Sequence, residues 1–207
     1  MATRPRSDPG HARLSDQLAD WLSGEGEKTL GGIIELFGRN SFAVLFVLLL
    51  GVSALPLPTG GATHVFEIVA MLLAVQLIAG RQEIWLPQRW RRLQLAGEKR
   101  ERFLNALMKI IRWLERFSRP RLRFLFGRRL SNAVFGVLVF AGSLGAFLAP
   151  PFTGLDTLPS LGVVLLSLGV ILEDIAVVVV ALAVGAAGVV LEIVLGRAAV
   201  HGLSSLF

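Results

Sequence analysis

Long apolar runs separated by short polar breaks dominate the chain. Ser41–Leu55 and Ile68–Gly80 are almost wholly apolar, and the stretch PLPTGGATHVFE lies between them. A second pair, Ala133–Ala149 and Ser160–Leu172, flanks PPFTGLDTLP. Fifteen helical residues reach about 22 Å, whereas the hydrocarbon core of a bilayer is about 30 Å thick. Arms this short around Pro and Gly predict re-entrant hairpins or pairs of discontinuous helices.

Three other segments show helical patterns. Ile175–Gly196 is the clearest full membrane span and contains many small residues that suit close helix contact. Leu14–Leu22 and Thr29–Arg39 place their apolar residues on one helical face. We expect them at the membrane interface or packed against a neighbouring helix. Residues 103–117 predict a basic amphipathic helix that ends at Pro120.

The two breaks align with each other at an offset of 94 residues without a gap. Both contain the pattern P-x-x-T-G-x-x-T in the same apolar context, which favours an internal duplication. A break in hydrocarbon leaves backbone N–H and C=O groups without partners, so it must line a cavity or be covered by protein. The predicted helix-breaking residues are Pro56, Pro58, Gly60, Gly61, Pro150, Pro151, Gly154 and Pro159.

These patterns predict an all-α integral membrane protein with duplicated Pro/Gly-broken apolar hairpins, amphipathic interfacial helices and a final transmembrane helix. Its predicted segments are a disordered tail (1–12), N-terminal amphipathic helices (13–39), a first hairpin repeat (40–80), a basic amphipathic linker (81–131), a second repeat (132–173), the final transmembrane helix (174–196) and a tail (197–207).

Composition and charge support a membrane location. The chain is 54% hydrophobic, with a mean hydropathy of +0.66, more than a wet protein surface allows. Residues 81–129 contain fifteen Lys or Arg against four Glu. A basic segment between apolar runs is typical of a cytoplasmic loop that contacts anionic lipid headgroups, rather than of a nucleic-acid site. The residues assigned to topology and lipid contact are Trp85, Arg89, Trp90, Arg91 and Arg92.

Polar residues at the two breaks form the candidate site. Intramembrane carboxylates are costly and are functional candidates by default. His64 and Glu67 are spaced to share one helical face, although Glu67 could instead lie near the headgroups or pair with His64 or a linker arginine. Asp156 could equally cap the following helix. The candidate polar site comprises Thr59, Thr63, His64, Glu67, Thr153, Asp156 and Thr157.

Three further acids have ordinary structural interpretations. Glu173 and Asp174 lie between two apolar runs, where acids favour a loop or a helix N-terminus. Glu192 lies near the expected membrane exit, where it could pair with Arg197.

The sequence contains no pattern for known catalysis or cofactor binding. It has no cysteine, and its three scattered histidines make no metal-binding spacing. No P-loop, dinucleotide fingerprint or nucleophile elbow is present. We therefore expect no metal, no cofactor and no catalytic residues, and the sequence favours a non-enzymatic protein without deciding the point.

The run PLPTGGATHVFEIVAMLLAVQLIAGRQEIWLP, the basic linker and PPFTGLDTLPSLGVVLLSLGVILEDIAVVVVALAVG together resemble the ExoD family of bacterial exopolysaccharide-synthesis proteins. The resemblance runs from about Leu14 to Gly196, and Asp156 departs from an Asn that is frequent there. It implies an inner-membrane protein needed for normal production of secreted polysaccharide. It carries over no catalytic residue.

Two functions stay open from the sequence. One is an accessory or assembly factor that contacts other polysaccharide-synthesis membrane proteins, with a homodimer compatible with the short apolar arms. The other is a small ion- or proton-coupled or substrate transporter with a polar site at the two breaks. An enzyme acting on a lipid-linked sugar has the least support. The expected location is the bacterial inner membrane, with several crossings and the basic linker in the cytoplasm.

Overall fold

The computed structural model describes residues 14–24, 29–55, 63–92, 108–109, 112, 129–149 and 153–204, and these form helices and connecting turns without a strand. The helix order is α1, α2, a short 3₁₀ turn at Gly38–Asn40, α3, α4, α5, α7, α8 and α9. Most of the predicted helix at 103–117 lies outside the described residues, as do the prolines and glycines at 56–61 and Pro150 and Pro151.

The chain divides into two compact units, and residues 1–35 and 86–118 form the first. It contains α1 (Leu14–Ser23), most of α2 (Leu30–Phe37) and α5 (Gln88–Arg91). The two predicted N-terminal helices are therefore present. A side chain at Gly31 would lie 3.1 Å from the Arg91 carbonyl oxygen, so glycine permits this approach.

Residues 36–85 and 119–207 form the second unit, and its described residues include five helices. These are α3 (Ser41–Ser53), α4 (Thr63–Ile78), α7 (Arg129–Leu148), α8 (Thr157–Ile171) and α9 (Ile175–Ser204). Each of the five predicted apolar runs thus forms one helix.

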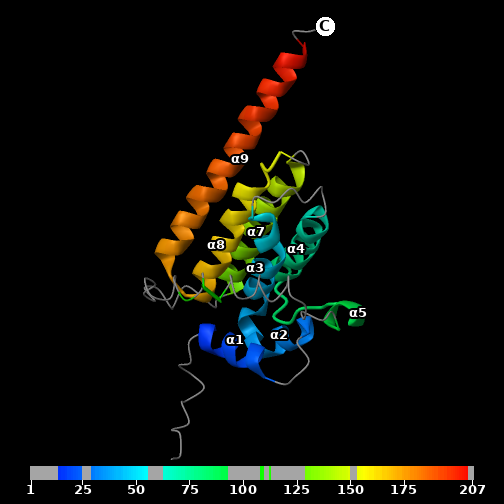
Figure 1. Cartoon of the computed structure of the whole chain (residues 1–207), viewed down its shortest axis with the longest axis vertical. Coiled ribbons are helices and arrows are strands. Elements are labelled where there is room, and N and C mark those ends of the chain that lie inside the picture. Colours follow the sequence, from blue (N-terminus) through cyan, green and yellow to red (C-terminus); the bar gives the residue numbers. More distant parts are fainter. Residues whose placement is uncertain are drawn as a thin grey trace, which may run out of the picture. The chain divides into compact units, whose positions relative to one another are not determined.

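The helices of the first predicted hairpin, α3 and α4, pack against those of the second, α7 and α8 (Figure 1). α3 packs against α8, α4 packs against α7, and α9 lies along α8. Phe46 is fully buried in the core, where its ring meets Phe135 edge-on at 5.7 Å between centroids. Such reciprocal pairing is what a duplicated hairpin would produce, and the duplication itself stays a prediction.

Pro159 is not a helix break, contrary to the sequence-based prediction. It is the third residue of α8 and is buried. Proline is tolerated in the first turn because the first N–H groups of a helix have no intrahelical partner. A Cβ at Gly188 of α9 would lie 2.7 Å from the Cδ of the Pro159 ring, so the glycine leaves room for the proline.

α4 and α8 end in the same way. At the end of α4, Gly80 has φ +79°, and the Arg81 N–H donates to the Gln76 carbonyl. At the end of α8, Glu173 has φ +54°, and the Asp174 N–H donates to the Gly169 carbonyl. Both ends are Schellman motifs, in which a left-handed residue lets the last carbonyls be satisfied.

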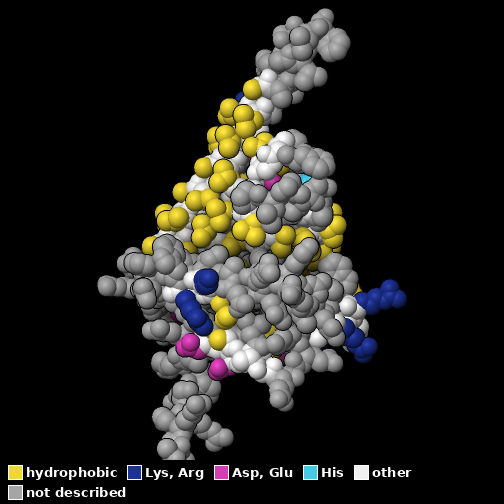
Figure 2. Space-filling view, viewed as in Figure 1, with side chains coloured by type: hydrophobic (Ala, Val, Ile, Leu, Met, Phe, Trp, Pro, Cys, Tyr) yellow, Lys and Arg dark blue, Asp and Glu magenta, His cyan; other side chains and the backbone are white. Residues whose placement is uncertain are grey.

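Two of the described helices are long and apolar enough to cross a membrane, namely Leu130–Leu148 within α7 and Ile175–Leu195 within α9. α9 continues to Ser204, beyond the predicted end at residue 196, because Arg197, Ala198 and Ala199 favour a helix. Only 11% of the Ile175–Leu195 window is buried. Apolar side chains accordingly cover α9 in the space-filling view (Figure 2).

The contact between α8 and α9 generates a stability prediction. A Cβ at Gly162 would lie 2.5 Å from the Gly185 Cα, whereas a Cβ at Gly185 would meet only the Gly162 Cα, at 3.6 Å. We expect Gly162→Ala to lower the free energy of unfolding by about 1–3 kcal/mol through overpacking. Gly185→Ala, the matched control, should be neutral or stabilising by up to about 1 kcal/mol. Thermal denaturation in detergent measures both, and equal effects would contradict this asymmetry.

Candidate functional site

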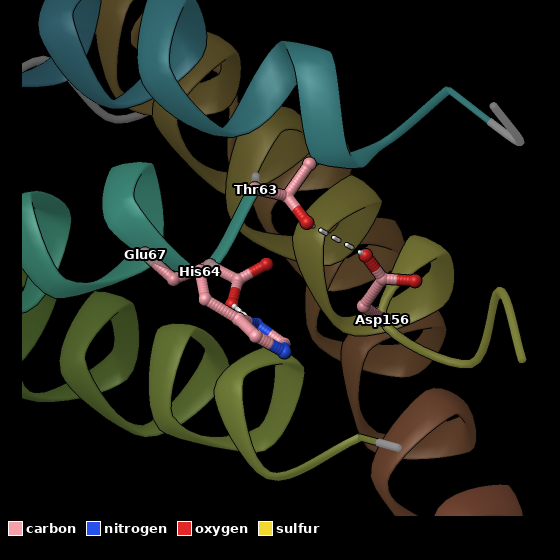
Figure 3. Close-up of polar contacts among 4 residues, drawn as sticks. All are labelled: Thr63, His64, Glu67 and Asp156. Atoms are coloured by element: carbon pink, nitrogen blue, oxygen red, sulfur yellow. Dashed lines mark hydrogen bonds and ion pairs between the residues drawn. The ribbon is translucent and has the colours of Figure 1, made fainter. Parts of the chain in front are cut away.

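Glu67 lies at the centre of a polar cluster in the second unit. It projects from the second turn of α4, and its side chain is fully buried. Its carboxylate Oε2 is 2.7 Å from the Nδ1 of His64, one turn earlier on the same helix (Figure 3). The His64 side chain is 25% exposed, so it connects the buried acid to the surface. The two side chains share one helical face, as their spacing predicted, and Glu67 is in the interior, where it pairs with His64 as the structural alternative proposed.

A second contact joins the starts of α4 and α8. The Thr63 hydroxyl donates to the Asp156 Oδ2 at 3.5 Å across 93 residues of sequence (Figure 3). Asp156 occupies the N-cap position of α8, as one interpretation of the sequence expected, but its side chain makes no capping hydrogen bond. The Asp156 carboxylate instead faces Thr63 at the start of α4.

Glu192 adds a third carboxylate from α9. One of its oxygens lies 3.8 Å from where a Cβ on Gly145 of α7 would sit, so glycine leaves room for it. The charges of Asp156 and Glu67 both act on it. The sequence placed Glu192 near the membrane exit, but it belongs to the cluster. Glu192 lies on α9, two turns after Val184. This position did not indicate membership of the cluster, because the partners of Glu192 come from other helices.

Several buried polar atoms in the cluster lack hydrogen-bond partners among the described residues. They include Glu67 Oε1, Glu192 Oε1 and the Ser53 hydroxyl. Ser53, the last residue of α3, faces Glu67 but makes no hydrogen bond of normal geometry with it. Unpaired buried polar groups are costly, which is why sites that retain them commonly take a further group.

The hydroxyls of Ser143 and Ser160 are also buried and unpartnered within the described parts of the chain. Ser143 lies one turn before Phe147, whose ring contacts His64 at 5.3 Å between centroids. Ser160 lies one turn after Asp156, and its N–H donates to the Asp156 carbonyl. Sequence analysis did not select either serine, since a lone Ser in an apolar helix gives no functional signal.

The cluster is rich in acceptors and has one ionisable base. Its ionisable groups are the three carboxylates of Glu67, Asp156 and Glu192 and the imidazole of His64. The arrangement therefore suits a proton or a hydrated cation better than an anion. No group of three His, Asp or Glu side chains in the described ranges has the geometry to hold a metal ion.

The other predicted site residues lie around this cluster or outside the described residues. Thr157 begins α8. Thr153 is exposed, and its hydroxyl accepts a hydrogen bond from the Leu155 N–H at 3.4 Å. Gly154 has φ +70°, a conformation that favours glycine. Thr59 lies outside the described residues.

Of two further acids, Asp174 has a structural role and Glu35 forms a surface ion pair. Asp174 caps α9, because its Oδ1 accepts the Ala176 N–H at 2.9 Å. This confirms the interpretation of Asp174 as a helix N-terminal residue. In the first unit, Glu35 lies 3.4 Å from Arg91, and both side chains are exposed. Such a pair stabilises little, so it leaves the predicted role of Arg91 in lipid contact open.

Comparison with known proteins places the chain in a family. The family described as "Exopolysaccharide synthesis, ExoD" matches residues 14–194. The chain belongs to the ExoD family. It is 32% identical over 160 residues to "Protein ExoD" of Rhizobium meliloti, covering 72% of this chain and 65% of that protein. The chain thus spans less than two thirds of that relative.

A second relative is "Uncharacterized protein slr1875" of Synechocystis. It is 31% identical over 157 residues, covering 74% of this chain and 73% of that protein. No solved structure matches. The resemblance noted from the sequence is therefore confirmed at the level of the family, which links the chain to exopolysaccharide synthesis.

Because three carboxylates converge in the cluster, we predict that replacing one of them with an uncharged amide stabilises the fold. We expect Asp156→Asn to raise the free energy of unfolding by about 1 kcal/mol, because like charges in a partly buried site repel on this scale or more. The amide can still accept from Thr63. Asp174→Asn is the matched control and should be near neutral, since Asn also caps helices. Thermal denaturation at neutral pH tests this, and a lower stability of Asp156→Asn would contradict it.

Proposed function

We propose that the chain is an inner-membrane protein that acts in exopolysaccharide synthesis or export as a non-enzymatic accessory or assembly factor. Membership of the ExoD family supports the process, and the apolar surface of α9 supports the mode of action. α9 leaves most of its long apolar window uncovered by the rest of the chain. In a bilayer that surface would contact lipid, a second copy of the chain or other membrane proteins of polysaccharide synthesis.

The proposed topology follows from charge and helix length. The basic segment 81–129 faces the cytoplasm by the positive-inside bias. α7 has 20 residues, or about 30 Å of helix, which matches the hydrocarbon thickness. α7 and α9 then cross the membrane, and the connection before α8 lies on the periplasmic side.

A second candidate function is transport coupled to a proton or another cation. The specific observation in its favour is the polar cluster, where Glu67, Asp156 and Glu192 converge from three helices. Intramembrane carboxylates of this kind commonly mark ion pathways. The exposed edge of His64 would connect the cluster to one side of the membrane.

Substitution of the cluster separates the two candidates. An accessory factor that acts through its surface should tolerate Glu67→Gln, because the amide keeps the size of the side chain and can still hydrogen-bond His64. A cation-coupled transporter should lose most of its function, since an amide cannot be deprotonated. The measurement is exopolysaccharide yield in a deletion strain complemented with each variant.

Immunoblots of the membrane fraction must show equal amounts of each protein. Glu35→Gln serves as the control, because Glu35 is exposed and lies in the other unit. We expect Glu67→Gln to retain a yield close to that of the unmodified chain. A yield near that of the deletion strain, at normal protein levels, would replace the accessory role with transport.

Cysteine labelling tests the topology, since the chain has no native cysteine. We expect Thr153→Cys to react with a membrane-impermeant maleimide in intact cells, because Thr153 is exposed and follows α7. Arg92→Cys, in the basic segment, should react only after the membrane is opened. Protection of Thr153→Cys in intact cells would instead favour a re-entrant hairpin, and Thr59→Cys tests the first break in the same way.

A further inference from the structure

A polar pocket lies at the opposite end of the second unit from the polar cluster. It has a volume of about 170 Å³ and is formed where α3 and α7 begin and where α4 and α8 end. We call it the Arg81 pocket. Its polar lining residues are Asn40, Arg81, Gln82, Asn132 and Glu173, and Phe42 and Phe135 are its aromatic residues.

Arg81 supplies the positive charge of the pocket. Its guanidinium makes no hydrogen bond or ion pair with any residue of the described ranges. The connection that carries Arg81 and Gln82 is nevertheless held in place. The Gln76 side chain donates to the Trp85 carbonyl at 3.2 Å and accepts the Trp85 N–H at 2.9 Å. A guanidinium without a protein partner at the edge of a pocket is suited to bind an anionic group such as a phosphate.

Glu173 occupies a position where glycine is the usual residue. It is the left-handed residue of the Schellman motif that ends α8, with φ +54°, and Gly80 has the equivalent place after α4. A side chain in this conformation is strained, and such strain gathers at functional sites. Because Glu173 lines the pocket, its carboxylate can accept hydrogen bonds from a hydroxyl or an amine of a ligand.

An apolar groove of about 290 Å³ adjoins the pocket. We call it the Leu138 groove, because Leu138 lies on its wall with Val134, Leu166 and Val178. Asn132, Phe135 and Val170 line both the groove and the Arg81 pocket. A charged, hydrogen-bonding pocket that continues into an apolar groove matches a molecule with a polar head and a hydrocarbon chain.

We propose that the Arg81 pocket and the Leu138 groove bind one phospholipid whose headgroup carries a hydroxyl or an amine. The phosphate lies against Arg81 and accepts hydrogen bonds from the carboxamides of Asn40 and Asn132. The headgroup hydroxyl or amine donates to Glu173, and one acyl chain follows the groove. The groove begins at Leu130, where the apolar window of α7 also begins, so this end of α7 is at headgroup depth if α7 crosses the membrane.

The test titrates the delipidated full-length protein in detergent with short-chain lipids and follows binding by native mass spectrometry. The probes are dioctanoyl phosphatidylglycerol, phosphatidylethanolamine and phosphatidylcholine, together with dioctanoylglycerol. We expect saturable binding of the first two. Phosphatidylcholine, which has no headgroup donor, and dioctanoylglycerol, which has no phosphate, should bind more weakly.

Arg81→Gln should weaken binding of phosphatidylglycerol by about tenfold or more, the scale of a hydrogen bond to a charged group. Arg89→Gln is a stringent control, because it removes the same charge from an exposed residue that lies outside the pocket but was itself predicted to contact lipid headgroups in general. An equal loss in Arg89→Gln would overturn the proposal in favour of general surface charge. Equal affinity for dioctanoylglycerol would overturn it as well.

Glu173→Gly provides a variant that should fold, because glycine suits the left-handed conformation. We expect it to keep or raise Tm and to lose the preference for phosphatidylglycerol and phosphatidylethanolamine over phosphatidylcholine. An unchanged preference would exclude Glu173 from the headgroup site. These binding measurements do not depend on exopolysaccharide yield, so the lipid site and the proposed function can fail separately.

Discussion

The complete burial of the Glu67 carboxylate is the constraint on which the arrangement of the second unit depends. A carboxylate inside an apolar bundle must be paired, hydrogen-bonded or neutral. His64 satisfies one oxygen at 2.7 Å, and the other faces a region supplied with polar atoms by Ser53 and Asp156. The helix ends that deliver these groups, at the close of α3 and the starts of α4 and α8, therefore have to meet. The glycines that bring α8 and α9 together also bring Glu192 to the same place.

The two ends of this unit differ in their chemistry. One end gathers three acids and several hydroxyls, which favours a positive ligand. The other end presents Arg81, carboxamides and Glu173 beside an apolar groove, which favours an amphiphile. Both ends are built on the same helices, since α4 begins with Thr63 in the cluster and is followed by Arg81 in the pocket. The two ends are therefore connected by the packing of these helices.

The apolar runs predicted the positions of the helices well, whereas the contacts between the helices could not be predicted from the sequence. Five runs gave five helices because burial and apolar length dominate helix placement here. The start of α8 was placed three residues late because Pro159 was read as a break, although a first-turn proline has no hydrogen bond to lose. His64 and Glu67 were correctly placed on one helical face because their spacing is local, and their pairing was one of the alternatives left open. Glu192 was not assigned to the cluster, since its neighbours come from distant segments.

The predicted duplication would have produced one polar cluster rather than two among the residues that the structure describes. At the offset of 94, His64 aligns with Leu158 and Glu67 with Leu161, whereas Asp156 aligns with Ala62. Ser53 aligns with Phe147, the residue whose ring contacts His64. Apart from Thr63 and Thr157, which align with each other, one predicted repeat thus supplies a polar group where the other supplies a small or apolar residue. Two symmetric sets would place twice as many acids in one apolar core, and their mutual repulsion and desolvation would oppose folding. An asymmetric pair of repeats would keep the reciprocal helix packing while concentrating the polar groups at a single site.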